Sequence, residues 1–344
     1  MNTKRYAVAL LAAATLAAPA AAAQDVTLTL HHFLGPQSTT HARVLAPWAE
    51  RIEAASDGRI AFRIFPSMTL GGRPPELYGQ ARDGVADIVW TLPSYTPGAL
   101  PRVEVFELPG VHQGSATQTN AAMQDLEGDL SADFDGVHPL LIHTHAGNAL
   151  HLRGAPVADL DDLAGLKLRT PSRTGGWMIE AWGAEAVGMP LPSLPQALSR
   201  GVVDGALIPF EVMPPFKLQE LTASSIEGPR GERFGTSVFL LAMNQARYDA
   251  LPADLRAIVD AESGAALAAL AGAAFDDEEQ VGVGRQRDSD GGRVVRLDAA
   301  AYDAMVAAAS PAIDRWLAAS AEAGFDGAAL LAAARAAMAR QSGG

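Results

Sequence analysis

Short strand-like segments alternate with amphipathic helical segments along this chain, and that alternation restricts the fold to the α/β class. Residues 26–32 alternate in polarity as a half-buried strand does, and apolar residues recur at helical spacing between 41 and 52. Strands at 60–64 and 88–90 flank a second helix at 75–82. Connections this short favour parallel strands joined by right-handed crossovers.

The same order of elements recurs further along the chain, with strands at 166–169 and 186–187 and helices at 174–182 and 194–199. A mature chain of about 320 residues exceeds a typical single domain. We therefore predict two α/β lobes, each a mixed, mostly parallel sheet flanked by helices, with a ligand cleft between them. The predicted first lobe comprises 24–147 plus about 236–275, and the second comprises 148–235 plus about 276–340.

The N-terminal segment 1–23 has the three parts of a secretory signal peptide. Lys4 and Arg5 form a positive start, residues 6–16 are apolar, and Ala21-Ala22-Ala23 provides a small-residue cleavage site. The alternative is a retained membrane anchor, but the apolar run is short for a bilayer and rich in alanine. The pattern predicts an exported, periplasmic protein, whose lack of cysteine suits a large domain that needs no disulfides.

The formal charge of −13 becomes −15 once Lys4 and Arg5 are removed with the signal peptide. A field of this sign repels nucleic acid and anionic lipid, so we predict no nucleic-acid partner. It also repels an anionic ligand, so an acid-binding site must depend on arginine or histidine placed locally.

The sequence contains no phosphate-binding loop, zinc-protease or esterase motif, and we predict no cofactor. Histidines gather at two places: His32 lies beside His31 near a strand end, and His145 lies near the lobe junction with His143 and His151. Three imidazoles can bind zinc or copper. Because no carboxylate follows at a ligand spacing, we predict no metal site, and we interpret these histidines as hydrogen-bonding groups in or near the cleft.

Several short segments, in a consistent order, resemble the DctP-type solute receptors of TRAP transporters, the tripartite ATP-independent periplasmic systems. The segments are Leu70-Gly71-Gly72, Gly165-Leu166-Lys167-Leu168-Arg169-Thr170-Pro171, Gly183-Ala184-Glu185, Met189-Pro190, 201–205 and 239–251. The resemblance covers nearly all of the mature chain. It implies a type II periplasmic binding protein-like fold that closes on a small organic acid and delivers it to the small and large subunits of a membrane permease.

In this family the arginine of the segment 165–171 pairs with the ligand carboxylate, and here it is Arg169. A guanidinium offers two parallel N–H donors that match both carboxylate oxygens, and it stays charged when desolvated. At the end of a buried strand it projects into the crevice where α/β sheets bind ligands. The alternative is a salt bridge inside one lobe.

The sequence departs from the sialic-acid-binding members of the family, which have a second arginine near the position of Ala149 and an asparagine at that of Ile208. His145, Asn148 or His151 can replace the second arginine. Ile208, which stands in place of the asparagine, makes that wall of the pocket apolar. We expect a pocket for an aromatic or branched monocarboxylate, lined by Trp90, Tyr95, Trp177 and Phe210. For each of these aromatic residues, the alternative is packing in the protein core. Arg173 is either a second donor or a surface arginine.

Two other classes of function compete with the receptor. A periplasmic enzyme acting on a carboxylate would use His145 with a carboxylate such as Glu211, and a metal-capture protein would use the histidines. A sensor protein is an alternative to the permease as the partner.

Overall fold

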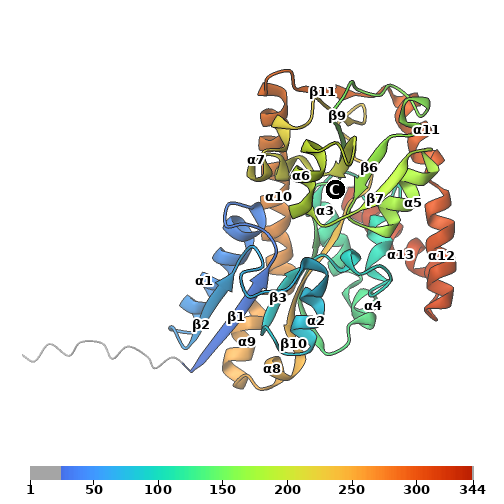
Figure 1. The fold of residues 1–344 in the computed structure, drawn as a ribbon. Helices are drawn as coiled ribbons and strands as arrows, with labels where there is room; N and C mark the ends of the chain where they lie inside the picture. The colour runs from blue at the N-terminus through green and yellow to red at the C-terminus, as the bar shows by residue number, and fades with distance from the viewer. Residues whose placement is uncertain (1–24, 343–344) are drawn as a thin grey trace, which may run out of the picture.

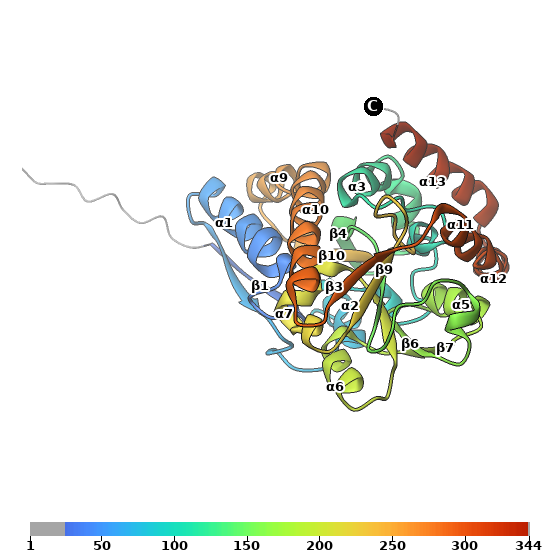
Figure 2. The same cartoon turned by 90° about the horizontal axis from the view of Figure 1, so that it is seen from above.

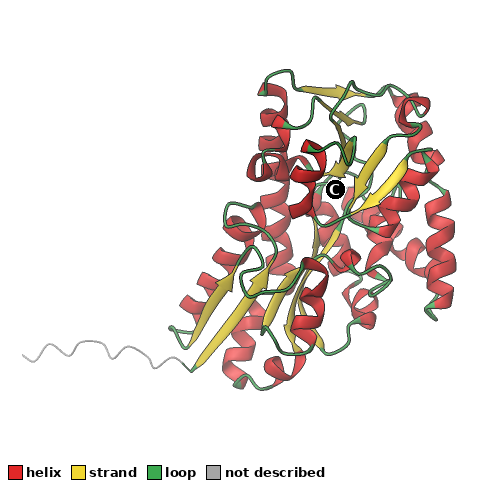
Figure 3. Cartoon of the chain, viewed as in Figure 1, coloured by secondary structure: helices red, strands yellow, loops and turns green. Residues whose placement is uncertain are grey.

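The structure, a computed structural model, describes residues 25–342, which form two α/β units, each built on its own sheet (Figures 1 and 3). The predicted signal peptide lies outside the described residues. The two sheets confirm the predicted fold class, because both are mixed and mostly parallel and both carry helices.

The first sheet has five strands in the order β2-β1-β3-β10-β4. Its strand β1 pairs in parallel with β2 and β3, whereas β10 runs antiparallel to β3 and β4. The strands are β1 (Val26–His32), β2 (Ile60–Phe65), β3 (Ile88–Thr91), β4 (Val137–Thr144) and β10 (Val238–Asn244). Helices α1 (Ala46–Ala55) and α2 (Leu77–Arg82) fall where helical spacing predicted them.

The second sheet has six strands in the order β11-β9-β5-β8-β6-β7, with β5 antiparallel to both of its neighbours. The strands are β5 (Ala149–Leu152), β6 (Lys167–Thr170), β7 (Glu185–Gly188), β8 (Gly205–Ile208), β9 (Ser224–Glu227) and β11 (Arg293–Arg296). Helices α5 (Arg173–Ala181) and α6 (Leu194–Ser199) connect the parallel strands. Each sheet therefore contains one strand, β10 in the first and β5 in the second, that runs opposite to the other strands of its sheet.

The chain passes between the units at three places: between β4 and β5, between β9 and β10, and along the helix α10 (Gly264–Asp288). Helix α10 packs on α3 (Ala116–Gln124) and β4 of the first unit and on residues 210–212 and β11 of the second. Residues 253–288, which include α9 (Ala253–Ala261), are long and apolar enough to cross a membrane. In the structure, however, Leu267, Ala271 and Phe275 of this segment are buried in the protein core.

The three C-terminal helices, α11 (Ala299–Ala308), α12 (Pro311–Glu322) and α13 (Gly327–Ser342), serve both units. Helix α12 packs on α5, but α13 packs on α3, which Figure 2 shows between α10 and α13. The sequence placed 276–340 wholly in the second lobe; α13 differs because its buried residues Leu330, Ala334 and Ala337 supply an apolar surface for the first unit. The remaining helices are α4 (Glu127–Leu130), α7 (Met213–Phe216) and α8 (Gln245–Asp249).

Candidate ligand-binding site

A narrow cavity of about 30 Å³ lies between the two units, where the carboxyl ends of several parallel strands meet. The first unit contributes Phe33, Trp90 and Tyr95 from segments at the ends of β1 and β3, together with Phe239 of β10. The second unit contributes Arg169 of β6 and the end of β8. The location is the predicted interlobe cleft.

Arg169 is the buried cation of this cavity. Its side chain is only 2% exposed. Its Nε and Nη2 donate to the carbonyl oxygen of Met189 at 3.0 and 2.8 Å, and Nη1 lies 3.5 Å from the carbonyl oxygen of Leu207. Within residues 25–342 no carboxylate lies at ion-pair distance from this guanidinium, so the described residues exclude the alternative of an internal salt bridge.

The environment of Arg169 favours an anionic ligand. Burial lowers the pKa of the guanidinium, and the nearby phenol of Tyr95 partly opposes this shift. A buried charge without a counter-ion is costly, and backbone carbonyls compensate only part of that cost. A ligand carboxylate facing Arg169 supplies the missing negative charge.

An aromatic wall stands on the first-unit side of the cavity. The rings of Trp90 and Phe239 are stacked, with centroids 4.7 Å apart and an interplanar angle of 11°. Phe33 stacks on the same indole with centroids 5.0 Å apart. The indole Nε1 donates to Nε2 of His143 at 2.9 Å, so the polar edge of Trp90 is already satisfied. This wall therefore presents mainly apolar ring surface.

On the second-unit side, Ile208 and Pro209 at the end of β8 also line the cavity. Ile208 is 1% exposed, and it supplies the apolar wall that the sequence predicted at this position. With aromatic rings on one side and aliphatic groups on the other, the cavity suits a flat apolar group attached to a carboxylate.

Two direct hydrogen bonds join the units around the cavity. The hydroxyl oxygen of Tyr95 accepts from the backbone N–H of Leu191 at 2.9 Å, and the hydroxyl of Thr39 donates to Oε2 of Glu211 at 2.9 Å. Tyr95, Leu191 and Glu211 line the cavity themselves. Contacts of this kind exist only when the units are close together, so the structure represents a closed arrangement.

Glu211 is a carboxyl group inside the cavity wall. Burial raises its pKa to about 8, and the hydrogen bond from Thr39 opposes this shift only in part. The group is consequently neutral at pH 7, where it does not repel an anionic ligand. Burial likewise lowers the pKa of His145 well below its usual value, which keeps the imidazole neutral. Within the described residues, no hydrogen bond joins His145 to Glu211.

The structure brings six of the predicted site residues to the cavity and places the other four elsewhere. Those at the cavity are Arg169, Trp90, Tyr95, His145, Asn148 and Glu211. Those elsewhere are His32, Arg173, Trp177 and Phe210.

Arg173 and Trp177 lie four residues apart on α5 and share a helix face that does not line the cavity. The guanidinium of Arg173 pairs with Glu104 of the first unit, with Nη2 and Oε2 2.7 Å apart. The ring of Trp177 lies next to the guanidinium groups of Arg173 and Arg315, at 5.2 and 4.8 Å. Arg173 is therefore neither a ligand donor nor a free surface arginine.

Phe210 and His32 are core residues in the structure. Phe210 is fully buried and packs edge-on against His151, with ring centroids 4.7 Å apart. His32 is also fully buried, and its Nε2 lies 2.9 Å from Nδ1 of His41. Both are neighbours of cavity residues in sequence, Phe33 for His32 and Glu211 for Phe210, but neither lines the cavity itself.

Sequence reasoning missed Phe33 and Phe239, which complete the aromatic wall. Phe33 directly follows the predicted strand 26–32, so its position at a carboxyl strand end was a usable signal. Phe239 had no such signal, because its place beside Trp90 depends on the pairing of β10 with β3, two strands nearly 150 residues apart in the chain.

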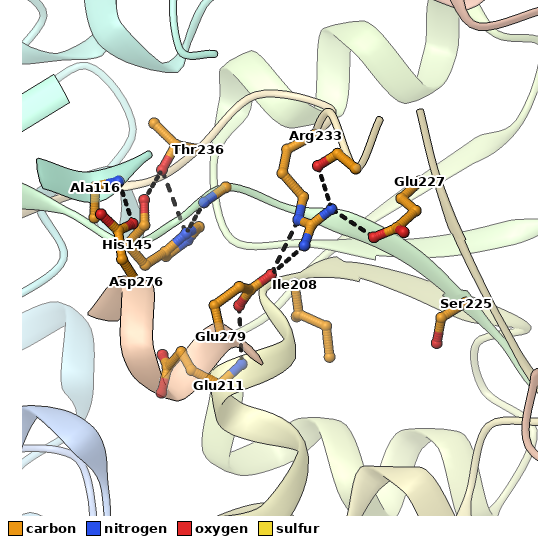
Figure 4. A network of polar contacts seen from close by, with 12 residues as sticks. Ala116, His145, Ile208, Glu211, Ser225, Glu227, Arg233, Thr236, Asp276 and Glu279 are labelled. Carbon is orange, nitrogen blue, oxygen red and sulfur yellow. Dashed lines mark hydrogen bonds and ion pairs between the residues drawn. The ribbon is translucent and has the colours of Figure 1, made fainter. Parts of the chain in front are cut away.

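A buried charge network lies behind the cavity, where the chain crosses between the units (Figure 4). Arg233 pairs with Glu227 at 2.8 Å and with Glu279 of α10 at 2.9 Å, and all three side chains are at most 4% exposed. Oε2 of Glu279 also accepts from the backbone N–H of Glu211 at 3.1 Å. The network therefore ties two crossings of the chain to a residue of the cavity wall.

Within residues 25–342, no group of three or more histidine, aspartate or glutamate side chains is arranged to hold a metal ion. The histidines near the crossings have other partners. Nδ1 of His151 lies 2.7 Å from the hydroxyl of Ser225, and Nδ1 of His145 accepts from the N–H of Gly147 at 3.0 Å.

Comparison with known proteins places this chain in a family. The family described as bacterial extracellular solute-binding protein, family 7 (DctP), matches residues 30–319. A solute-binding protein of Albidiferax ferrireducens is 27% identical over 257 residues, which cover 72% of this chain and 74% of the relative.

Solved structures of TRAP solute-binding proteins are similar to this chain over most of its length. A TRAP solute-binding protein from an unidentified marine microbe, specific for aromatic acid ligands and bound to metahydroxyphenylacetate, is 37% identical with a TM-score of 0.88. The match covers 92% of this chain and 99% of that one. A TRAP solute-binding protein of Rhodoferax ferrireducens with copurified benzoate is 38% identical with a TM-score of 0.84, covering 92% of this chain and 98% of that one. The chain therefore belongs to family 7 of the bacterial extracellular solute-binding proteins, the DctP family of TRAP receptors.

Proposed function

We propose that this protein captures a small aromatic monocarboxylate in the interlobe cavity and delivers it to a TRAP permease. The observation that carries the proposal is Arg169, a 2% exposed guanidinium without a carboxylate partner in residues 25–342, in a cavity that also contains the stacked rings of Trp90 and Phe239. A bidentate pair with the ligand carboxylate neutralises the guanidinium, and the ring of the ligand packs on the aromatic wall.

The ligands of the related structures support this ligand class. The marine and Rhodoferax proteins hold metahydroxyphenylacetate and benzoate, and a more distant Bordetella bronchiseptica protein, 28% identical, holds both enantiomers of mandelate. All of these ligands combine one carboxylate with one aromatic ring.

The mechanism is domain closure without covalent chemistry. The lobes divide at the crossings near Gly147 and Gly235, and the cavity takes side chains from both. Because ligand contacts to both lobes are complete only in the closed form, the ligand shifts the population toward closure. The permease, through its small and large membrane subunits, then receives the closed receptor in the periplasm, to which segment 1–23 directs the chain.

The test is isothermal titration calorimetry with benzoate on the wild type and on Arg169→Met. Loss of the charge-assisted pair in a dry cavity costs at least about 2 kcal/mol, so affinity falls by about 30-fold or more. Arg200→Met is the matched control, because it removes the same charge from an exposed position and leaves affinity near that of the wild type. Near-native benzoate affinity in Arg169→Met would contradict the proposal.

Mass spectrometry of small molecules released from freshly purified protein identifies the natural ligand. A receptor releases the acid unchanged after prolonged incubation, whereas an enzyme acting through His145 and Glu211 converts it.

A further inference from the structure

The side chain of Asn148 has an unused acceptor in the cavity wall. Asn148 lies in the crossing between β4 and β5, where its backbone N–H donates to Gly235 at 2.8 Å and its carbonyl accepts from Phe234 at 2.7 Å. These two bonds fix the backbone against the neighbouring crossing. The side chain is 5% exposed and lines the cavity, yet its Oδ1 has no hydrogen-bond partner in the described residues. A buried acceptor left unpaired is costly, so this group is suited to a ligand donor.

His145, three residues earlier on the same crossing, supplies a donor. Its Nδ1 accepts from the N–H of Gly147 at 3.0 Å and lies 3.3 Å from the hydroxyl of Thr236 (Figure 4). Since Nδ1 accepts, the proton of the neutral ring is on Nε2. No described residue accepts from Nε2, and the ring lines the same cavity as Asn148. One acceptor, Oδ1 of Asn148, and one donor, Nε2 of His145, therefore lie where the crossing between β4 and β5 lines the cavity, which we call the hinge side.

These two groups lie apart from the carboxylate anchor. Asn148 directly precedes β5, and Arg169 belongs to β6; the two strands flank β8 on opposite sides. Two strand spacings, roughly 10 Å, therefore separate the strand lines from which the two side chains start. The polar groups of the cavity consequently fall at two separate places, with the apolar end of β8 between them.

A hydroxyl group matches the hinge-side pair, because it donates one hydrogen bond and accepts another. A second carboxylate matches less well, because it adds a second negative charge to the cavity and cannot donate to the unpaired Oδ1 of Asn148. An unsubstituted ring leaves Oδ1 unpaired.

We propose that Asn148 and His145 form a subsite for a hydroxyl group on the ring of the ligand, so that the protein prefers hydroxylated aromatic acids to their unsubstituted counterparts. This inference rests on the proposed function, because the carboxylate of the same ligand occupies Arg169.

The test compares dissociation constants of benzoate, the three monohydroxybenzoates and the three monofluorobenzoates for the wild-type protein. The fluorobenzoates place a small substituent at the same ring positions but donate no hydrogen bond. We expect at least one hydroxybenzoate to bind at least about tenfold more tightly than benzoate and than its fluorinated counterpart.

The variant Asn148→Leu brings this ratio of dissociation constants to about one, because it removes the acceptor at similar side-chain size. Tyr95→Phe is the matched control: it deletes a polar group beside Arg169 and weakens both acids alike, so the ratio stays as in the wild type. Thermal melting verifies that each variant is folded. If Asn148→Leu does not fold, the wild-type ligand series still tests whether the protein prefers a hydroxylated acid.

The outcomes separate the two proposals. Binding of benzoate without preference for any hydroxybenzoate would overturn the subsite and leave the proposed function standing. An equal change of the ratio in Asn148→Leu and Tyr95→Phe would also overturn the subsite. Failure of the wild type to bind any of the acids would overturn the proposed function together with the subsite.

Discussion

Arg173 of the second unit holds the buried carboxylate of Glu104 of the first unit through three hydrogen bonds of 2.7 to 3.0 Å. Glu104 is 2% exposed, and burial raises its pKa to about 7 although the guanidinium opposes the shift. Next to this pair, the hydroxyl of Thr174 donates to Glu107, also of the first unit, at 2.7 Å. The start of α5 is therefore bound to the first unit by two carboxylates that lie outside the cavity.

The first prediction concerns closure. Arg173→Ala removes contacts that exist only when the units are together, so the open form gains population and the apparent affinity for benzoate falls by about tenfold. Small-angle X-ray scattering of the unliganded variant shows a larger radius of gyration than that of the wild type. An unchanged affinity and an unchanged radius would show that the pair does not hold the units closed.

The second prediction concerns the pH dependence of stability. The pKa of Glu211 is about 8 in the folded protein against 4.5 for an ordinary glutamate, so the unfolded chain ionises first as pH rises. The stabilising contribution of the protonated group is complete below about pH 4.5 and is lost as pH rises through about 8. Urea unfolding at about pH 5 and about pH 9 therefore shows the wild type losing stability relative to Glu211→Gln.

The same group controls binding at high pH. Glu211 faces Thr39 of the first unit, and the charges of Glu278 and Glu279 on α10 act on it. Benzoate affinity of the wild type falls as pH rises through about 8, because an ionised Glu211 repels the carboxylate. In Glu211→Gln the affinity stays level over that range, and a parallel decline in both proteins would contradict the role of Glu211.

The third prediction compares a phenylalanine of the cavity wall with a phenylalanine of the protein core. Phe239→Leu removes a ring of the aromatic wall and lowers benzoate affinity by about 3- to 10-fold, the equivalent of roughly 0.5–1.5 kcal/mol. Phe210→Leu alters the core, so it lowers the free energy of unfolding by about 1 kcal/mol or more and changes affinity less. Calorimetry and urea unfolding on both variants check this contrast, which equal affinity losses would contradict.

The fourth prediction concerns the charge network behind the cavity. Arg233→Met leaves Glu279 buried without its cation and leaves Glu227 with only the exposed Arg296, and the expected loss is about 3–5 kcal/mol in the free energy of unfolding. Arg230→Met is the control, because Arg230 is 87% exposed and its pair with Glu232 contributes about 0–1 kcal/mol. Urea unfolding at neutral pH measures both, and a similar small loss in the two variants would refute the role of the network.

The sequence predicted the parts of this protein that depend on local pattern. The alternation of residues 26–32, the helical spacing of 41–52 and the strand before Arg169 all follow from periodicity over a few residues, which strand and helix geometry dictates. The segment resemblance then assigned Arg169 to a ligand cleft, and the structure places it there.

The features that the sequence did not predict depend on contacts between residues that are distant in the chain. The partner of Arg173 lies 69 positions earlier in the chain, so its spacing from Arg169 alone suggested a second ligand donor. The rotation of α5 about its axis decides whether Trp177 faces the cavity, and that rotation depends on its packing against α12, β7 and β6. Which lobe α13 packs on likewise depends on the apolar surface that the helix covers.

The charge network at Arg233 has a consequence for the route of the ligand. Two of the three chain crossings are fastened there, and Gly147 of the remaining crossing is so close that an added Cβ would lie 2.5 Å from the side chain of Arg233. The rear of the cavity thus acts as a pivot with little freedom to widen. Opening breaks the contacts that Tyr95, Thr39 and Arg173 make between the units, so the acid enters and leaves where these contacts separate.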